Sequence, residues 1–248
     1  MPVFLPPHSQ QFPDIRYADE SGLLAYGGDL TPETLLLAYQ SGVFPWYNES
    51  DVKSLLPWCN SPALWWSPDP RCVINPQLYQ ASHSLKKTLK GEKYSITVDR
   101  CFAEVIRRCA APRTYANETW INQKIIASYS KLHQMGVAHS IETWNQQGEL
   151  VGGLYGINLG KLFFGESMFS TATDASKVAF AFLMFICAKW QFPIVDCQLP
   201  NDHLLSLGAY TIPRTEFLSI LTDYKDLEKP NWQALQNVVH STKEITLV

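Results

Sequence analysis

The strongest constraint on the fold of this chain is the order of segments between residues 138 and 198. Residues 138–144, 149–159 and 161–169 have the composition of three consecutive strands, with turns at Gly148 and Gly160. The apolar run 178–188 is too short to cross a bilayer, so we expect a buried helix over about 174–189. A further strand, 192–198, follows. The pattern predicts an α/β (α+β) protein whose mostly antiparallel sheet packs against helices.

The chain before this segment has a different character. Residues 31–33 (Thr-Pro-Glu) provide an N-cap, a first-turn proline and a first-turn acid, which predicts a helix over about 32–40. Two aromatic-proline turns follow at 43–47 and 64–71. We therefore expect a small N-terminal α/β domain over 1–80 and a larger domain over 81–248 with a central mixed sheet. The polar tail after residue 226 is expected to be loosely held.

Charge is distributed unevenly along the chain. The net charge of −3 and the pI of about 6.1 give no sign of a nucleic-acid binder. Residues 83–113, however, hold eight lysines and arginines against three acids, a local charge of +5. Such a segment is typical of phosphate contacts, and a solvated helix face is the alternative interpretation. The cations that we select as candidates for phosphate contacts are Lys86, Lys87, Arg107 and Arg108.

The cysteines argue against a metal centre. None of the six cysteines forms a CxxC pair, and no cysteine–histidine group has the spacing of a zinc site. We recognise neither a signal peptide nor a membrane-spanning segment. We therefore expect reduced thiols, no bound metal and a cytoplasmic location.

Polar side chains stand out in two apolar segments. Glu166 follows the run 162–164, and it is interpreted either as a solvated strand end or as a recognition carboxylate in an apolar pocket. Asp196 and Gln198 lie two residues apart on a predicted strand, so they should share one face while Cys197 points to the other. A carboxylate and an amide so placed can accept a proton and stabilise an oxyanion, or they can simply hydrogen-bond to each other.

Short motifs in a fixed order add a further observation. They include Trp-Trp-Ser-Pro-Asp-Pro-Arg at 65–71, Gly-Glu-Ser-Met-Phe-Ser at 165–170 and Asp-Cys-Gln at 196–198. Together with the remaining matching segments, they closely resemble the leucyl/phenylalanyl-tRNA–protein transferase family. Those segments are 22–30, 44–47, 119–121, 138–142, 151–156, 175–177 and 206–209.

The resemblance implies an aminoacyltransferase with a C-terminal domain similar to the GNAT fold. Members of the family move leucine or phenylalanine, and methionine less readily, from aminoacyl-tRNA to the N-terminal lysine or arginine of an acceptor protein. The product carries a destabilising N-terminus that marks it for degradation. Because an aminoacyl ester is already activated, aminolysis needs alignment and proton transfer but no ATP, metal or cofactor. We expect a monomer that contacts no membrane.

The resemblance also implies roles for individual residues. Asp196 with Gln198 would be catalytic, assisting the attacking amine and steadying the tetrahedral intermediate. Glu166 would hold the α-amino group of the aminoacyl moiety. Trp46 and Trp120 would pack on the terminal adenosine, and the basic candidates would bind tRNA phosphates. The apolar side-chain pocket would be formed by Leu154, Phe163, Met168, Phe180 and Leu183.

Other functions compete with this interpretation. An acetyl-CoA-dependent acetyltransferase would need a glycine-containing loop before its helix to cradle pyrophosphate, and residues 170–174 (Ser-Thr-Ala-Thr-Asp) contain no glycine. A non-enzymatic RNA-binding module would explain the basic segment and the aromatic turns. It would leave Asp196, Gln198 and Glu166 without a role.

Overall fold

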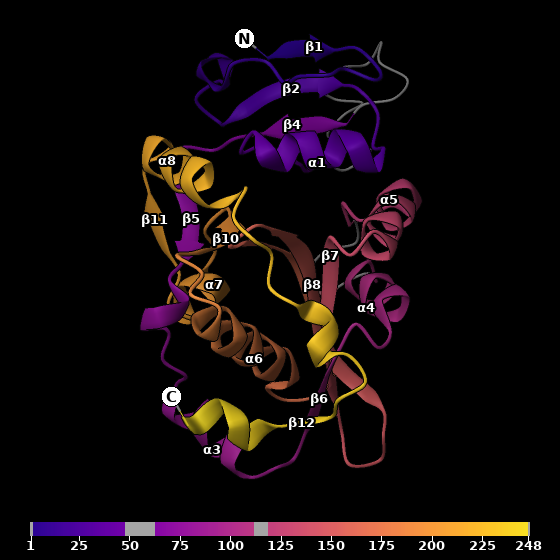
Figure 1. The fold of residues 1–248 in the computed structure, drawn as a ribbon, viewed down its shortest axis with the longest axis vertical. Helices are drawn as coiled ribbons and strands as arrows, with labels where there is room; N and C mark the ends of the chain where they lie inside the picture. The colour runs from indigo at the N-terminus through magenta and orange to yellow at the C-terminus, as the bar shows by residue number, and fades with distance from the viewer. Residues whose placement is uncertain (1, 48–62, 112–118, 248) are drawn as a thin grey trace.

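The computed structural model describes residues 2–47, 63–111 and 119–247 (Figure 1). One of the basic residues in the segment 83–113, Arg113, lies outside these ranges. Within the described residues, the N-terminal part forms a four-stranded sheet in the order β1-β2-β4-β3. These strands span Val3–Leu5 (β1), Leu23–Gly27 (β2), Phe44–Pro45 (β3) and Leu64–Trp66 (β4).

The rest of the described chain is built on an eight-stranded sheet in the order β11-β5-β10-β9-β8-β7-β6-β12. Strands β9 and β10 pair in parallel and the other neighbours are antiparallel, so the predicted α/β class with a mixed, mostly antiparallel sheet is confirmed. The strands are Arg71–Ile74 (β5), Ser95–Val98 (β6), Ala138–Trp144 (β7), Leu150–Leu159 (β8), Leu162–Ser170 (β9), Val195–Gln198 (β10), Tyr210–Ile212 (β11) and His240–Ser241 (β12).

Helices cover both faces of the large sheet. The predicted apolar helix is α6, Ala175–Lys189, which packs on β7, β8 and β9 (Figure 1). Helices α4, Phe102–Cys109, and α5, Gln123–Gln134, pack on the same strands from the other face, as the separation of the buried core into two clusters indicates. The other helices of the described residues are α1 (Pro32–Gln40), α3 (His83–Lys90), α7 (Asp202–Ser206) and α8 (Arg214–Tyr224), with 3-10 segments at Ile15–Tyr17, Pro76–Leu78, Trp232–Leu235 and Thr242–Leu247.

Helix α1 begins as its sequence predicts. The Thr31 side chain accepts a hydrogen bond from the Thr34 backbone N–H, and Pro32 occupies the first turn. The helix ends at Gln40, just before Gly42, which adopts the left-handed conformation. Its buried face points Tyr39 toward the large sheet, where this side chain contacts Phe164 of β9.

The two sheets divide between Trp66 and Arg71. Strand β5 already pairs with β10 and β11, so residues 71–74 contribute to the larger sheet. The domain boundary near residue 80 stays a prediction. What matters for the site is that α1 contacts the middle of β9 at Glu166, and that β3 lines one cavity together with residues of β9 and β10.

The expectation of a loosely held tail is wrong. The Trp232 side chain is only 5% exposed and stacks on His139 of β7, with 4.1 Å between ring centroids. Its indole N–H donates to Asn158 Oδ1 at 3.0 Å, and β12 pairs with β6. One buried tryptophan and a short strand anchor a segment whose overall polarity suggested that it would be free.

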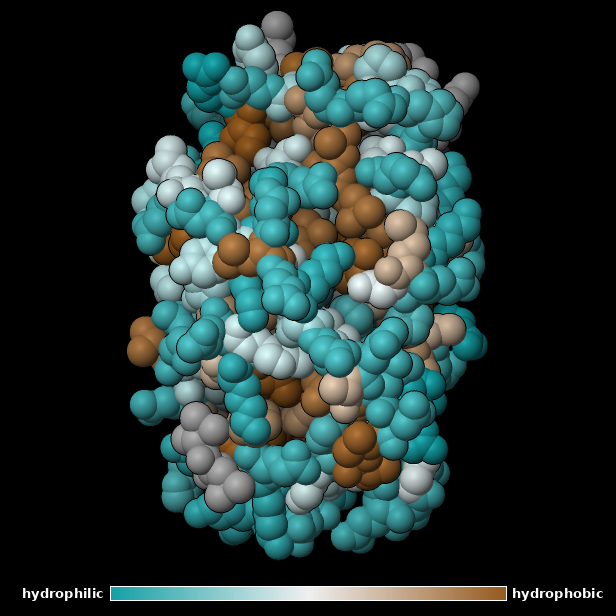
Figure 2. Space-filling model, viewed as in Figure 1, coloured by the Kyte–Doolittle hydropathy of each residue, from teal (hydrophilic) through white to brown (hydrophobic). Residues whose placement is uncertain are grey.

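The described helices include none that is long and apolar enough to cross a membrane. Nor do the described side chains gather three or more histidine, cysteine, aspartate or glutamate residues in a way that could hold a metal ion. Figure 2 shows hydrophobic side chains at the surface across the upper half of the face seen in Figure 1, where the N-terminal part meets the large sheet.

Candidate active site

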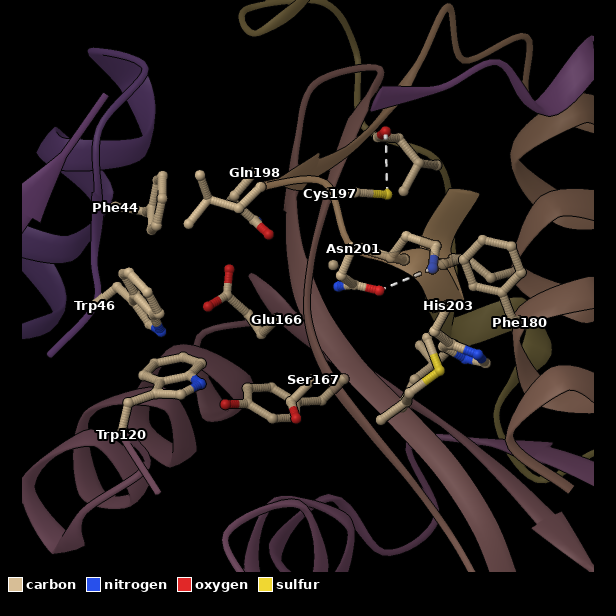
Figure 3. Close-up of a pocket in the computed structure, with 18 of the residues that line it drawn as sticks. Phe44, Trp46, Trp120, Glu166, Ser167, Phe180, Cys197, Gln198, Asn201 and His203 are labelled. Atoms are coloured by element: carbon tan, nitrogen blue, oxygen red, sulfur yellow. Dashed lines mark hydrogen bonds between the residues drawn. The ribbon is translucent and has the colours of Figure 1, made fainter. Parts of the chain in front are cut away.

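A cavity of about 660 Å³ lies where the N-terminal part meets β8, β9, β10 and α7 (Figure 3). The N-terminal part contributes aromatic side chains from β3 and the residue after it, and the large sheet contributes the polar groups. The residues that line the cavity are Phe44, Pro45, Trp46, Trp120, Leu154, Tyr155, Gly165, Glu166, Ser167, Met168, Phe180, Leu183, Val195, Cys197, Gln198, Leu199, Asn201, Asp202, His203 and Leu204.

Six of the seven predicted substrate-binding residues line this cavity. Trp46 and Trp120 lie on one side of Glu166, away from Phe180 (Figure 3). The seventh, Phe163, is absent from the lining, because its ring is fully buried and packs 5.7 Å from that of Trp232. Its assignment to the pocket is therefore corrected to the core beneath it. The predicted residues that do form the apolar wall are Leu154, Met168, Phe180 and Leu183.

Irregularities in two neighbouring strands turn the polar side chains toward the cavity. In the pairing of β8 with β9, Tyr155 is opposite Ser167 and Gly156 is opposite Gly165, so Glu166 is the extra residue of a β-bulge. The pairing of β10 with β5 shifts between Asp196 and Gln198 in the same way. Bulges of this kind re-aim single side chains.

The Glu166 carboxylate is held by two tyrosines. Tyr39 of α1 donates to Oε1 at 2.7 Å and Tyr129 of α5 donates to Oε2 at 2.9 Å, while the two hydroxyls also contact each other. Burial raises the pKa of Glu166 from 4.5 to about 7; the two tyrosine hydrogen bonds lower it, Asp196 raises it and Arg71 lowers it. Glu166 is therefore a carboxyl group that can gain or lose a proton near neutral pH.

Asp196 does not line the cavity, contrary to the expectation that it shares a face with Gln198. Its side chain is 2% exposed and accepts two hydrogen bonds from Arg71, Nε to Oδ1 at 2.8 Å and Nη2 to Oδ2 at 2.6 Å. The bulge breaks the strict alternation on which the expectation rested, so Cys197 and Gln198 both reach the cavity. The Asp196 carboxylate is already engaged by a cation and is poorly placed to accept a proton from substrate.

Arg71 connects the two parts of the protein at this point. Its guanidinium is fully buried between the rings of Phe44 and Phe217, 4.9 and 4.3 Å from their centroids. Nη1 also donates to the Gly42 carbonyl at 3.1 Å. The ion pair thus fixes the strand that carries Gln198 to the segment that carries Phe44.

Two polar atoms of the cavity lining have no hydrogen-bond partner among the described residues. These atoms are the side-chain nitrogen of Gln198, Nε2, and the hydroxyl oxygen of Tyr155, both buried. Gln198 also adopts a left-handed backbone with φ of 57°, which is uncommon outside glycine. An unpaired buried donor costs about 1–3 kcal/mol, so these two groups mark where a polar ligand atom belongs.

The four basic candidates do not form one cluster. Lys86 and Lys87 are exposed on α3, which lies at the far end of the large sheet from α1 (Figure 1). On α4, Arg107 pairs with Glu104 at 3.2 Å. Arg108 pairs with the same glutamate at 2.8 Å and donates to the Leu150 carbonyl at 2.6 Å. The two arginines therefore already have protein partners, while the ammonium groups of the two lysines are exposed to solvent.

Sequence reasoning gave no role to Tyr39, Tyr129 or Arg71. Arg71 does end the motif at 65–71, and a charged residue in an apolar strand was a signal that it has a buried partner. The tyrosines lie in ordinary amphipathic helices, and nothing local distinguishes them from core aromatics.

Comparison with known proteins decides the family. A sequence model described as "Leucyl/phenylalanyl-tRNA protein transferase" matches residues 73–222, and one described as its N-terminal domain matches 28–69. The chain belongs to this family. Proteins named leucyl/phenylalanyl-tRNA–protein transferase from Cellvibrio japonicus and Pseudomonas fluorescens are 52% and 50% identical to it, covering 90% and 93% of this chain and 91% and 97% of their own. The predicted family membership is confirmed.

Two solved structures are weakly similar to this chain. L-PGS from Bacillus licheniformis matches with a TM-score of 0.38 and 10% identity, over 72% of this chain and 54% of its own. The C-terminal domain of a lysylphosphatidylglycerol synthetase described as putative, from Agrobacterium fabrum, matches with a TM-score of 0.36 and 9% identity, over 82% and 61%. Neither likeness bears on the function of this chain.

Proposed function

We propose that this protein transfers leucine or phenylalanine, and methionine less readily, from aminoacyl-tRNA to the N-terminal lysine or arginine of acceptor proteins. The reaction is aminolysis of the ester, and its product carries a destabilising N-terminus for degradation. The protein acts as a monomer in the cytoplasm. The observation that supports this function is one cavity in which an apolar wall meets Glu166 and the unpaired Gln198 amide.

The apolar wall holds the side chain of the transferred amino acid. Leu154, Phe180 and Leu183 are nearly fully buried, so the wall excludes water from an unbranched or aromatic side chain. Each methylene gained or lost in such a pocket changes binding by about 1–3 kcal/mol. Trp46 and Trp120 pack on the terminal adenosine, where base–aromatic stacking is worth about 1–3 kcal/mol.

The polar groups act on the reacting atoms. Gln198 Nε2 donates a hydrogen bond to the carbonyl oxygen of the ester and keeps this hydrogen bond when the oxygen becomes an oxyanion. Glu166 binds the α-amino group of the aminoacyl moiety. Asp196, held by Arg71, positions Gln198, whose backbone N–H donates to Asp196 Oδ1 at 3.0 Å. Lys86 and Lys87 bind phosphates of the tRNA body. Arg107 and Arg108 bind further tRNA phosphates from a separate surface, on α4.

Transfer of labelled phenylalanine tests this function. Charged tRNA is mixed with the protein and a peptide that begins with arginine, and in parallel with the same peptide beginning with alanine. Label on the arginine peptide alone, without ATP or CoA, is the expected result. No label on either peptide, with the charged tRNA intact, would contradict the function, and stabilisation of the protein by CoA would favour the acetyltransferase alternative.

A further inference from the structure

Glu166, Tyr39 and Tyr129 form a closed ring of three oxygen contacts. Tyr39 Oη contacts Glu166 Oε1, Tyr129 Oη contacts Glu166 Oε2, and the two hydroxyl oxygens contact each other. Both tyrosine side chains are fully buried, and burial raises their pKa values well above 10, so each keeps its single proton. Two hydroxyl protons can fill only two of the three contacts.

The third contact is filled when Glu166 carries a proton. In that state Glu166 Oε2 donates to Tyr129, Tyr129 donates to Tyr39, and Tyr39 donates to Glu166 Oε1. When Glu166 is ionised, Tyr129 turns its proton to Oε2 and Tyr39 still donates to Oε1. The same three side chains therefore accommodate both states, and only the Tyr129 hydroxyl proton changes its partner.

We propose that Glu166 is the proton acceptor of the aminolysis, with Tyr39 and Tyr129 as the positioning residues that let it gain and release a proton without moving. This inference rests on the proposed function and names the group at that site that handles the proton. Asp196 is excluded from the role by its ion pair with Arg71 and its absence from the cavity lining.

The substrate brings the attacking amine within reach of Glu166. One carbon atom separates the aminoacyl α-amino group from the ester carbonyl carbon, so a carboxylate that binds this group also lies beside the amine that attacks the carbonyl. Each carboxylate oxygen has two lone pairs, and a tyrosine occupies one of them. A carboxyl group whose pKa is about 7 is well matched to an α-amino group with an ordinary pKa of about 8.

The proton and the bonds balance over the reaction. The amine nitrogen bonds to the ester carbonyl carbon, and one proton from that nitrogen passes to Glu166. When the bond from carbon to the ribose oxygen breaks, Glu166 gives the proton to that oxygen. One amine and one ester become one amide and one hydroxyl, and Glu166 returns to its ionised state.

Other charged and titratable groups surround Glu166, and they define what else could titrate in the site. Asp196 raises the pKa of Glu166 and Arg71 lowers it, and Tyr155 lies beside it. Helix α7 adds two further groups to the cavity lining. By element, these groups are Tyr39 (α1), Arg71 (β5), Tyr129 (α5), Tyr155 (β8), Asp196 and Cys197 (β10), Asp202 and His203 (α7).

The test is the pH dependence of single-turnover transfer at saturating enzyme. The rate of the wild-type protein should fall as the pH drops below about 7, and we call this part of the profile the acid limb. The Glu166→Gln variant should have no acid limb, and its rate at pH 8 should be at least about 100-fold lower than that of the wild type. Tyr129→Phe removes a donor to the ionised form and should move the limb to higher pH. Tyr17→Phe, a change at an exposed tyrosine, should leave the profile unchanged.

Controls separate the enzyme from its substrates. Two acceptor peptides with different α-amino pKa values identify the part of the profile that belongs to the acceptor, because only that part moves with the peptide. Infrared difference spectra between pH 5.5 and 8.5 report the carboxylic acid directly. The band lost from wild-type protein at high pH should be absent from Glu166→Gln.

Two results would overturn the inference. One is an acid limb in Glu166→Gln at the wild-type position, and the other is a Tyr129→Phe profile that coincides with that of wild type. If wild-type protein shows no transfer to any acceptor, the proposed function fails instead. The infrared titration still decides the protonation of Glu166 in that case.

Discussion

The buried Arg71–Asp196 pair gives a sharp prediction about stability. Asp196→Asn keeps the size of the side chain but leaves a fully buried guanidinium without its counter-charge. Both hydrogen bonds to Arg71, at 2.6 and 2.8 Å, lose their ionic partner. Breaking a buried pair by removing one charge destabilises a protein by about 3–5 kcal/mol.

Urea unfolding followed by tryptophan fluorescence measures this change. With an m-value of about 3 kcal/mol/M, the midpoint for Asp196→Asn should fall by roughly 1–1.7 M. The double variant Arg71→Met/Asp196→Leu should recover much of this loss, because apolar residues can replace a buried pair at little net cost. Asp223→Asn, at an exposed position on α8, is the matched control.

Two outcomes would refute this reasoning. The first is a midpoint for Asp196→Asn within about 0.3 M of wild type. The second is a double variant as unstable as the sum of the two single changes. Residual transfer by Asp196→Asn should keep the wild-type pH profile, because the loss comes from disturbed positioning of Gln198 and not from a missing base.

The remaining predictions concern the substrates and the titration of the site. Trp46→Ala should raise the KM for charged tRNA by about 5- to 150-fold, the equivalent of one stacking contact, and an unaltered KM would argue against stacking. Lys86→Ala with Lys87→Ala should lower the slope of log KM against log salt by about 1–2, and an equal slope would remove α3 from the tRNA surface. Glu166→Gln should be more stable than wild type by up to about 3 kcal/mol at pH 8 and equal to it at pH 4. The pKa of this half-buried carboxyl is raised from 4.5 to about 7, so stability present below pH 4.5 is lost as the pH rises through 7. Calorimetry of both proteins at pH 4 and pH 8 checks this difference in stability, and equal melting temperatures at pH 8 would contradict the prediction.

Much of the fold follows from local sequence patterns. The helix at Pro32–Gln40 has the bounds that its capping residues predict, and the meander of β7, β8 and β9 follows from its turn residues. These features depend on neighbours in the chain, which is why sequence reasoning reaches them.

The fine structure of the site does not follow from such patterns. A two-residue period places Asp196 and Gln198 on one face, but the shift in pairing with β5 breaks this period. The bulge at Glu166 likewise depends on how β8 pairs with β9. The position of a β-bulge depends on how two strands pair, and no local sequence motif predicts it.

Long-range partners are equally hidden. Arg71 is 125 residues from Asp196, and Tyr39 is 127 residues from Glu166. Each partner lies in an element whose own sequence is ordinary. The resemblance to the family made Glu166 and Gln198 candidate site residues, but it did not reveal the two tyrosines that hold the carboxyl group.

The most direct test of the account asks whether transfer takes place in this cavity. Met168→Trp fills the apolar wall, and Leu78→Trp adds the same side chain at a position that is 74% exposed and outside the cavity lining. Both variants are first shown to have the melting temperature of the wild-type protein. Transfer of labelled phenylalanine to a peptide that begins with arginine is then measured in single turnovers. We predict wild-type rates for Leu78→Trp and rates at least about 100-fold lower for Met168→Trp, because the ester can no longer be aligned. Transfer by Met168→Trp at the wild-type rate would contradict the account.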